Sequence, residues 1–184
     1  AADSRLWTSY KAALDKGDGY ALRILFALCV TEIQAGEIEH ARQTGALMLE
    51  QARRGKSILI EGWAHWWLGL VHYQWNELET AAQHFHAITE QLYSLHSSTV
   101  WLGLLGLILV QFARGELAGA EQTVVLLSQL DVDTLSYETE DTLAARAWLQ
   151  FLRGDVVSAW RWADAYTAPV PDQPLYGPAR AISM

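Results

Sequence analysis

A six-residue pattern recurs four times in this 184-residue chain, and it constrains the fold more than any other feature. Each copy reads Gly or Asn, an acid, an aliphatic residue, two variable residues and Ala. The copies begin at Gly36, Asn76, Gly115 and Gly154, so successive copies are 40, 39 and 39 residues apart. Repetition at such a period is typical of folds built by stacking one supersecondary unit on the next.

The pattern has the chemistry of a tight turn between two helices. Gly, or Asn as second choice, ends a helix in the left-handed conformation. The following acid suits the positive N-terminal end of the next helix. The aliphatic residue and the Ala fall on one face of that helix, where the small Ala lets the paired helices approach closely. The predicted turn residues are Gly36, Ala41, Asn76, Ala81, Gly115, Ala120, Gly154 and Ala159.

Helix-sized runs flank every turn, and no window alternates with period two, so the predicted class is all-α. The runs before the turns span residues 19–35, 57–75, 98–114 and 136–153. Those after the turns span 37–54, 77–95, 116–130 and 155–167, and one more helix is expected over 4–16. Ser57, Ser98 and Ser136 are the predicted N-caps, and residues 131–134 form a predicted joint.

We therefore predict a right-handed superhelical stack of antiparallel helix pairs, with about four repeats and an N-terminal helix, over residues 1–168. Residues 169–184 contain all four prolines of the chain. Because proline stops helices, this segment is expected to join the stack to a further, truncated helix. That expectation makes the chain a piece of a larger protein.

Composition limits the classes of partner. The net charge is -8 and the 13 basic residues are scattered, so no direct nucleic-acid contact is expected. The longest apolar run, from Val100 to Val110, is shorter than the roughly 18–20 residues of a membrane span. The single Cys29 lies in an apolar run, which predicts a core thiol. Without disulfides or a signal peptide, a cytoplasmic location is expected.

The second repeat resembles a tetratricopeptide repeat (TPR). The matching positions are Leu68, Gly69, Tyr73, Asn76, Leu78, Ala81 and Phe85. Two features depart from that motif: the period is 39–40 residues instead of about 34, and the closing proline is absent. The long period with its Gly-x-Leu-x-x-Ala turn is similar to the repeat domain of MalT-like regulators, which are LuxR-type, signal-transducing ATPases.

In that family a nucleotide-binding module precedes the repeats, a DNA-binding helix-turn-helix follows them, and the repeats serve as sensor and oligomerisation arm. The resemblance implies a non-catalytic sensor and protein-binding segment of a transcription regulator. The alternative is a general TPR scaffold that binds a peptide or a partner subunit and has no link to transcription.

No catalytic residue, cofactor or metal is expected. Arg54-Gly55-Lys56-Ser57 matches the end of a phosphate-binding loop, but Glu50 replaces the required glycine. His65 and His72 lie about 10.5 Å apart along one helix, too far to share an ion. His84 and His86 point to different faces. The acids of residues 138–141 fall at a predicted helix N-terminus, where the dipole explains them.

An aromatic and aliphatic stripe is the candidate binding surface. Its spacings of three and four residues place it on one helical face, which the TPR pattern assigns to the concave side. The candidates are Trp63, Trp66, Trp67, Leu70, Tyr73, Leu109, Phe112, Trp148 and Phe151. A protein or small-molecule effector would bind there, and self-association is a further mode. The alternative is that the stripe forms core between repeats. Trp160 and Trp162 cannot share one core, so one of them is expected to be semi-exposed.

Overall fold

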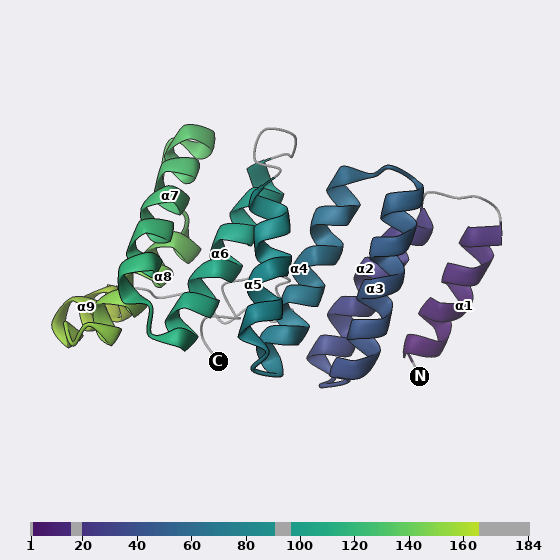
Figure 1. Cartoon of the computed structure of the whole chain (residues 1–184), viewed down its shortest axis with the longest axis horizontal. Coiled ribbons are helices and arrows are strands. Elements are labelled where there is room, and N and C mark those ends of the chain that lie inside the picture. Colours follow the sequence, from purple (N-terminus) through teal and green to yellow (C-terminus); the bar gives the residue numbers. More distant parts are fainter. Residues whose placement is uncertain (1, 16–19, 91–96, 166–184) are drawn as a thin grey trace. The chain divides into compact units, whose positions relative to one another are not determined.

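The computed structural model of the chain describes residues 2–15, 20–90 and 97–165. These residues form nine α-helices and no strand, which confirms the all-α class (Figure 1). The predicted joint over 169–184 lies outside the described residues. The helices divide into two compact units, Ala1–Gly103 and Leu104–Met184. Each unit is a set of helix pairs and is described by itself.

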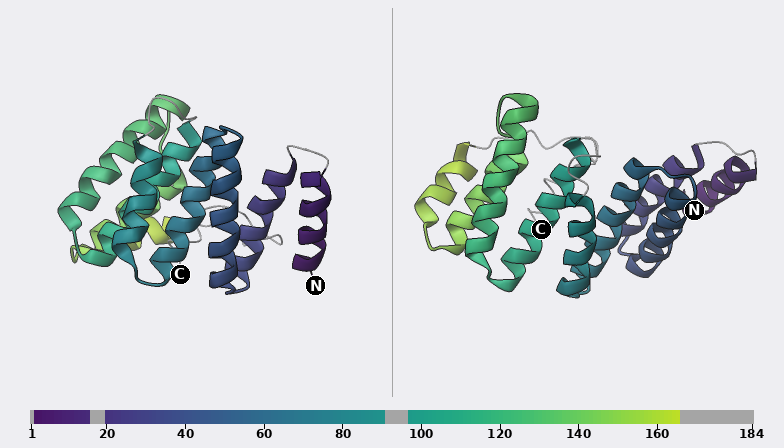
Figure 2. Two further views of the ribbon diagram at one scale, coloured as in Figure 1. Left: turned by 45° about the vertical axis from the view of Figure 1, so that its right-hand side comes forward. Right: turned by 45° about the horizontal axis from the view of Figure 1, so that its top comes forward.

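Unit 1 consists of successive helices, of which the first five pack side by side, each against the next (Figures 1 and 2). In order they are α1 (Ala2–Asp15), α2 (Tyr20–Gln34), α3 (Ile38–Arg54), α4 (Ile58–Gln74), α5 (Leu78–Thr89) and the start of α6 (Ser97–Arg114). Its core gathers apolar residues from α1 to α4, including Tyr10, Leu25, Leu28, Met48 and Ala64. Because α2 also contacts α4, helices of successive pairs share this core.

Unit 2 contains the rest of α6 followed by α7 (Leu117–Leu135), α8 (Glu140–Leu152) and α9 (Val156–Ala165). Helix α8 packs against both α7 and α9. The fully buried residues of this unit include Leu105, Ile108, Leu127 and Ala145. No residue of α9 is buried, which distinguishes it from the other helices that follow a repeated turn.

The four repeated turns adopt one geometry. Gly36, Asn76, Gly115 and Gly154 have φ of 75°, 61°, 71° and 85°, the left-handed conformation that the pattern predicts. At Asn76, the backbone N–H donates to the Tyr73 carbonyl at 3.0 Å, and the N–H of Glu77 donates to the His72 carbonyl at 2.9 Å. The same pair of bonds occurs at the other three turns. This pairing satisfies carbonyls at the end of the first helix.

In each copy of the pattern, the Ala N–H donates the first hydrogen bond of the next helix to the carbonyl of the acid four residues earlier. Ala81 N–H donates to the Glu77 carbonyl at 3.0 Å, and the equivalent bond is present after each of the other turns. The alanines Ala41, Ala81 and Ala120 are fully buried, whereas Ala159 is half-buried. The acids Glu37, Glu77 and Glu116 occupy the N-cap position itself, and their side chains do not cap the backbone.

Gly69 allows helices α4 and α5 to pack closely against each other. A Cβ placed on Gly69 of α4 would lie 2.4 Å from the Phe85 ring of α5. The absence of a side chain at Gly69 therefore makes room for the fully buried Phe85. Sequence and packing agree here, since both residues belong to the TPR-like pattern.

The boundary between α7 and α8 differs from the prediction. Residues 131–134 belong to α7, and Ser136 is the left-handed C-cap of that helix with φ 67°, so its assignment as an N-cap was wrong. The N-cap of α8 is Thr139, whose side chain accepts a hydrogen bond from the Thr142 N–H. The predicted joint lacked a glycine, and Ser136 supplies the positive φ in its place. Ser57 does occupy the N-cap of α4, but its side chain makes no capping bond.

Candidate functional site

In unit 1 the aromatic stripe lies largely within the packing between helices. Trp66 is only 3% exposed, and its ring contacts that of Phe85 at a centroid distance of 5.6 Å. Trp63 and Trp67 are half-buried and flank Phe26 of α2 in edge-on contacts of 4.9 and 5.3 Å. These three tryptophans therefore join α4 to α5 on one side and to α2 on the other, as the core interpretation expects.

The remaining stripe positions of unit 1 are intermediate. Leu70 and Tyr73 are half-buried, and burial raises the pKa of the Tyr73 hydroxyl. The indole nitrogen of Trp67 is buried and has no hydrogen-bond partner within the described part of the chain. Such an unsatisfied donor is unusual in a protein interior. Among the described stripe residues, Trp67 alone has a buried side-chain nitrogen or oxygen without a hydrogen-bond partner.

In unit 2 the stripe residues of α6 are buried or half-buried, whereas those of α8 are exposed. Leu109 is buried and Phe112 is half-buried, whereas Trp148 is 42% and Phe151 is 48% exposed. The rings of Trp148 and Phe151 contact each other at 5.5 Å with an interplanar angle of 30°. These two candidates form an aromatic pair that solvent reaches.

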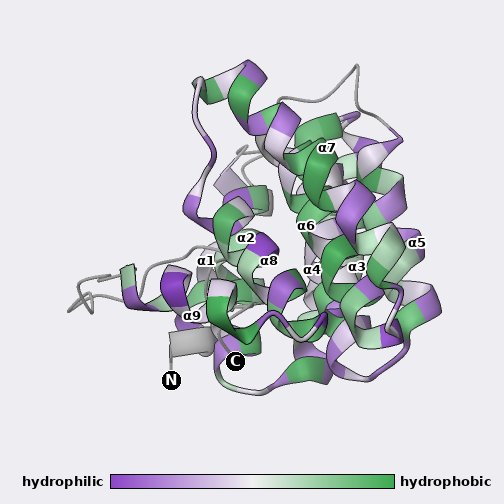
Figure 3. Cartoon of the chain, turned by 90° about the vertical axis from the view of Figure 1, so that its left-hand side faces the viewer, coloured by the Kyte–Doolittle hydropathy of each residue, from purple (hydrophilic) through white to green (hydrophobic). Residues whose placement is uncertain are grey.

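Four more exposed apolar residues accompany this pair on α8 and α9. Trp160 is the most exposed of them, at 70%. We call the set the α8–α9 surface; it consists of Trp148, Phe151, Leu152, Val156, Val157 and Trp160. Figure 3 shows hydrophobic and hydrophilic residues interspersed along α9. The spacing of Trp160 and Trp162 predicted that one of them is semi-exposed, whereas no sequence pattern indicated the exposure of Leu152, Val156 and Val157.

Charged residues border the α8–α9 surface. Arg153, in the turn between the two helices, donates to both carboxylate oxygens of Glu121 on α7 at 2.9 and 2.6 Å. On α9 the exposed Arg161 follows Trp160. Asp155, which directly precedes α9, accepts a hydrogen bond from the Ser158 N–H at 3.1 Å. An apolar centre with a charged rim is the usual anatomy of a protein-binding surface.

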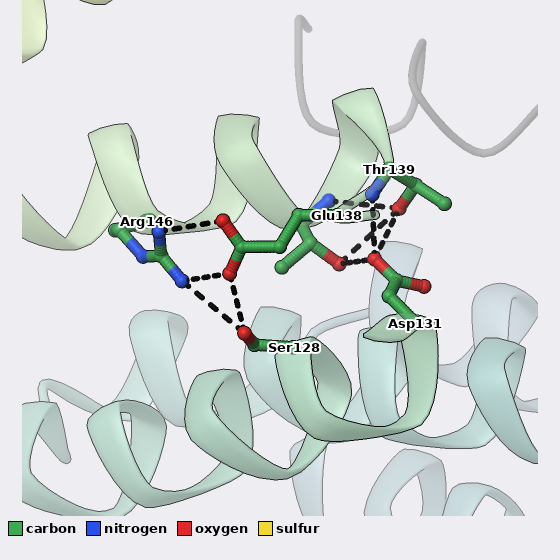
Figure 4. Close-up of polar contacts among 6 residues, drawn as sticks. Ser128, Asp131, Glu138, Thr139 and Arg146 are labelled. Carbon is green, nitrogen blue, oxygen red and sulfur yellow. Dashed lines mark hydrogen bonds and ion pairs between the residues drawn. The ribbon is translucent and has the colours of Figure 1, made fainter. Parts of the chain in front are cut away.

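A buried polar cluster, which no sequence pattern predicted, holds α7 to α8 (Figure 4). Asp131 is buried, and its Oδ2 accepts hydrogen bonds from the Thr139 N–H at 2.7 Å, the Thr139 hydroxyl at 2.8 Å and the Thr142 hydroxyl at 2.6 Å. A carboxylate with three donors is well satisfied. Asp131 thus fixes the start of α8 against the last turns of α7.

The second half of this cluster is an ion pair. Arg146 of α8 donates to both carboxylate oxygens of Glu138, which also accepts from the Ser128 hydroxyl of α7 (Figure 4). Hydrogen bonding to Arg146 is the main cause that lowers the pKa of Glu138. Nearby, burial raises the pKa of Asp141 to about 6, with Glu140 and Asp131 adding to the effect. Glu138 and Asp141 therefore have pKa values shifted in opposite directions, which the helix-dipole interpretation did not predict.

Three histidines meet between α4 and α5. The Nδ1 atoms of His65 and His84 lie 2.9 Å apart, and the His72 ring stacks on that of His84 with centroids 5.4 Å apart. Burial is the main cause of the lowered pKa of His65. It is also the main cause that lowers the pKa of His84, to about 4. At neutral pH both rings are uncharged, so one can donate and the other accept.

The sequence argument compared histidines along a single helix and therefore missed this cluster, which forms across the pair. Glu61 lies 3.9 Å from the His65 Nε2, Glu77 lies 2.6 Å from the His72 Nδ1, and Arg53 pairs with Glu61. Across residues 2–15, 20–90 and 97–165, no three or more His, Cys, Asp or Glu side chains are placed to hold one metal ion. Cys29 is fully buried, and burial raises the pKa of its thiol.

None of the helices in the described part of the chain has the length and apolar character needed to cross a bilayer. No protein-family model, curated protein or solved structure matches the chain. Any proposal about function therefore rests on the geometry of the two units.

Proposed function

We propose that the chain is a non-catalytic protein-interaction segment that binds a partner protein through the α8–α9 surface. The observation that supports this most directly is the joint exposure of Trp148, Phe151 and Trp160. Contiguous exposed apolar residues mark interaction surfaces in proteins. Tryptophan in particular is enriched among the residues that dominate binding energy.

We also infer a TPR-like right-handed superhelix, built as a single repeat domain over residues 1–168. Four turns of identical hydrogen bonding at a period of 39–40 residues support it. Repeats of this kind are stabilised by neighbour-to-neighbour packing, as between Phe26 and the tryptophans of α4. Repeat stacks present extended surfaces to other molecules.

The long repeat period supports a place within a MalT-like, LuxR-type transcription regulator in the cytoplasm. In that setting the segment would act as sensor and would make no nucleic-acid or membrane contact of its own. The full-length gene tests this: a phosphate-binding ATPase module before the repeats and a helix-turn-helix after them are expected. A gene with neither would leave a general scaffold as the better account.

A small-molecule effector at the aromatic residues of α2 and α4 is a second candidate. It rests on the buried indole nitrogen of Trp67, which has no acceptor among the described residues. A thermal-shift screen compares the native chain with Trp67→Phe, which keeps an aromatic ring and removes the indole N–H donor. Ligands that raise the melting temperature of the native chain but not of the variant are expected. If every stabilising ligand raised both melting temperatures equally, this candidate would be contradicted.

Site-specific photocrosslinking tests the protein-binding proposal. A photoreactive residue replaces Val157 on the α8–α9 surface and, as a matched control, the exposed Gln122 on α7 of the same unit. In cells that make the native protein, a discrete protein adduct is expected from position 157 and none from position 122. Adding Trp160→Ser should remove the adduct. Absence of any adduct at position 157 would refute the proposal.

A further inference from the structure

We propose that three histidines form an acid-released latch, which holds α5 against α4 at neutral pH and lets α5 move away when protons bind. The latch consists of His65 and His72 on α4 and His84 on α5. It lies in unit 1 and is independent of the α8–α9 surface in unit 2. Histidine clusters that change charge in mild acid are a recognised basis of such switches.

The contact between His65 and His84 accommodates a single Nδ1 proton. The two Nδ1 atoms lie 2.9 Å apart, so one ring donates its Nδ1 proton and the other accepts it with a lone pair. A protonated histidine carries a proton on both ring nitrogens. When both rings are protonated, two donors therefore face each other, and the hydrogen bond between the helices becomes a repulsive contact.

His84 is the only latch residue on α5, and it meets a histidine on each side. Its Nδ1 faces His65, and its ring stacks on that of His72 with centroids 5.4 Å apart and an interplanar angle of 10°. Both of these neighbours belong to α4. Repulsion between a charged His84 and its charged neighbours therefore acts between the two helices.

The carboxylates around the latch can balance charge on α4 but not on α5. Glu61 lies 3.9 Å from the His65 Nε2, and Glu77 lies 2.6 Å from the His72 Nδ1. Within the described part of the chain, His84 has no carboxylate partner of its own. Acid therefore adds a proton to α5 that no nearby acid offsets.

The other faces of α5 supply no such partner. The end of α5 meets α6 at Gly103, where a Cβ would lie 2.9 Å from the Thr89 side chain, and residues 97–103 of α6 include no charged residue. The remaining titratable residues on or next to α5 are all exposed: Glu79, His86 and Glu90. The response to acid at this helix is therefore expected to come from His84.

The docked position disfavours the charged form of His84. Burial is the main cause that lowers its pKa to about 4, and the positive charges of His65, His72 and Arg53 lower it further. Once α5 has moved away, the ring is solvated and its pKa returns to the usual value of about 6.5. Protons therefore bind the released helix more tightly, so docking is at full strength above pH 6.5 and weakens as the pH falls towards 4.

Apolar packing determines how far the release extends. Phe85 and Ile88 of α5 are buried, and the Phe85 ring packs against that of Trp66 at a centroid distance of 5.6 Å. Uncovering these residues opposes release at every pH. The latch is therefore expected to raise the population of a locally opened state of α5 and to leave the other helices of unit 1 folded.

Amide hydrogen exchange, corrected for the intrinsic pH dependence of exchange, tests the proposal on the native chain. The protection of α5 amides is expected to fall about tenfold between about pH 7.5 and about pH 5.5, the change that the lowered pKa of His84 implies. Helix α2 contains no histidine and should keep its protection, so it is the internal reference. An unchanged α5, or equal changes in α5 and α2, would overturn the proposal.

Two substitutions at one position test whether His84 carries the response. His84→Gln cannot bind the proton, so the protection of α5 should be the same at both pH values. His84→Lys places a positive charge there permanently, so α5 should exchange rapidly at both pH values while α2 stays protected.

The exposed His86 provides the matched controls on the same helix. His86→Gln and His86→Lys should both behave as the native chain does. A native pH response in His84→Gln, or native protection of α5 at neutral pH in His84→Lys, would contradict the latch. If either His84 variant fails to fold, the comparison of α5 with α2 in the native chain still decides the proposal.

Discussion

The second and fourth repeats share one turn but differ in what surrounds it. Asn76 and Gly154 have the same left-handed φ and the same backbone hydrogen bonds. After the first of these turns, α5 buries Ala81, Ala82, Phe85 and Ile88; after the second, α9 buries nothing. The repeated turn therefore specifies the helix pair, whereas the neighbouring helices that pack on the pair determine how much of it is buried.

The two units show the same contrast. Of the fifteen large hydrophobic residues that are exposed in the described part of the chain, eleven lie in unit 2. The stripe position six residues before the turn illustrates the change: Val30 and Leu109 are buried, Leu70 is half-buried and Trp148 is exposed. Placing the largest side chain where it is least covered is consistent with a docking role for the fourth repeat.

The largest expected effect separates these two repeats directly. Trp66→Ala should lower the free energy of unfolding by about 3–5 kcal/mol, because it empties a buried aromatic site against Phe85. Trp148→Ala should lower it by less than about 1 kcal/mol, because the ring is already half in solvent. Urea denaturation of both variants measures the difference. Equal losses of unfolding free energy in the two variants would contradict the contrast between the buried and the exposed tryptophan.

The polar cluster of unit 2 is the next target. Asp131→Ala should lower the free energy of unfolding by about 2–3 kcal/mol, since it strips the buried Thr142 hydroxyl of its carboxylate acceptor. Asp133→Ala, on the exposed side of the same helix, is the matched control and should have little effect. Amide hydrogen exchange is expected to accelerate at the start of α8 in the first variant alone. Similar exchange in both variants would rule out the anchoring role of Asp131.

Gly69 tests how a pair within unit 1 is packed. Gly69→Ala should destabilise by about 1–3 kcal/mol, because the added Cβ would overlap the Phe85 ring. In the fourth repeat the equivalent positions are Ala147 and Ala163, so a Cβ at the first position occurs together with loss of the aromatic ring at the second. Phe85→Leu should therefore recover part of the loss in a double-mutant cycle. Strict additivity of the two changes would contradict this coupling.

The smallest expected effect is the part of the pH dependence of stability that comes from the histidines of α4 and α5. Burial lowers the pKa of His84 from its usual 6.5 to about 4, so the folded protein favours the neutral ring. Stability from this group is therefore full above pH 6.5 and declines as the pH falls towards 4. The melting temperature of His84→Gln should vary less over that window than that of the native chain. The exposed His86→Gln is the control, and an identical pH profile for all three proteins would contradict the assignment.

The turns and the helix pairs could be predicted because they depend on local chemistry. A left-handed residue, an acid and an alanine at fixed spacing determine backbone geometry within six residues, and all four copies adopt it. The break after residue 54 was predicted, but the positive φ there falls on Lys56. The break before α8 was placed at 131–134, whereas the positive φ falls on Ser136. Propensity does not identify such positions, since packing of the adjoining helices imposes the conformation.

The side-chain clusters could not be predicted because they form between helices. His84 meets His65 and His72 only when α5 folds against α4, and spacing along either helix says nothing of that contact. Asp131 was placed in a joint, and its role depends on the start of α8 lying beside it. The stripe residues were identified correctly as apolar, but the periodicity of one helix does not reveal which neighbour covers them.

The access of a soluble paramagnetic agent to the tryptophan indoles tests the central contrast most directly. In NMR spectra of protein with nitrogen-labelled tryptophan, the Trp148 and Trp160 signals are predicted to broaden as the agent is added, because both residues are exposed. The Trp66 signal is predicted to stay sharp, because that ring is buried against Phe85. Broadening at Trp66 with none at Trp148 and Trp160 would contradict the account.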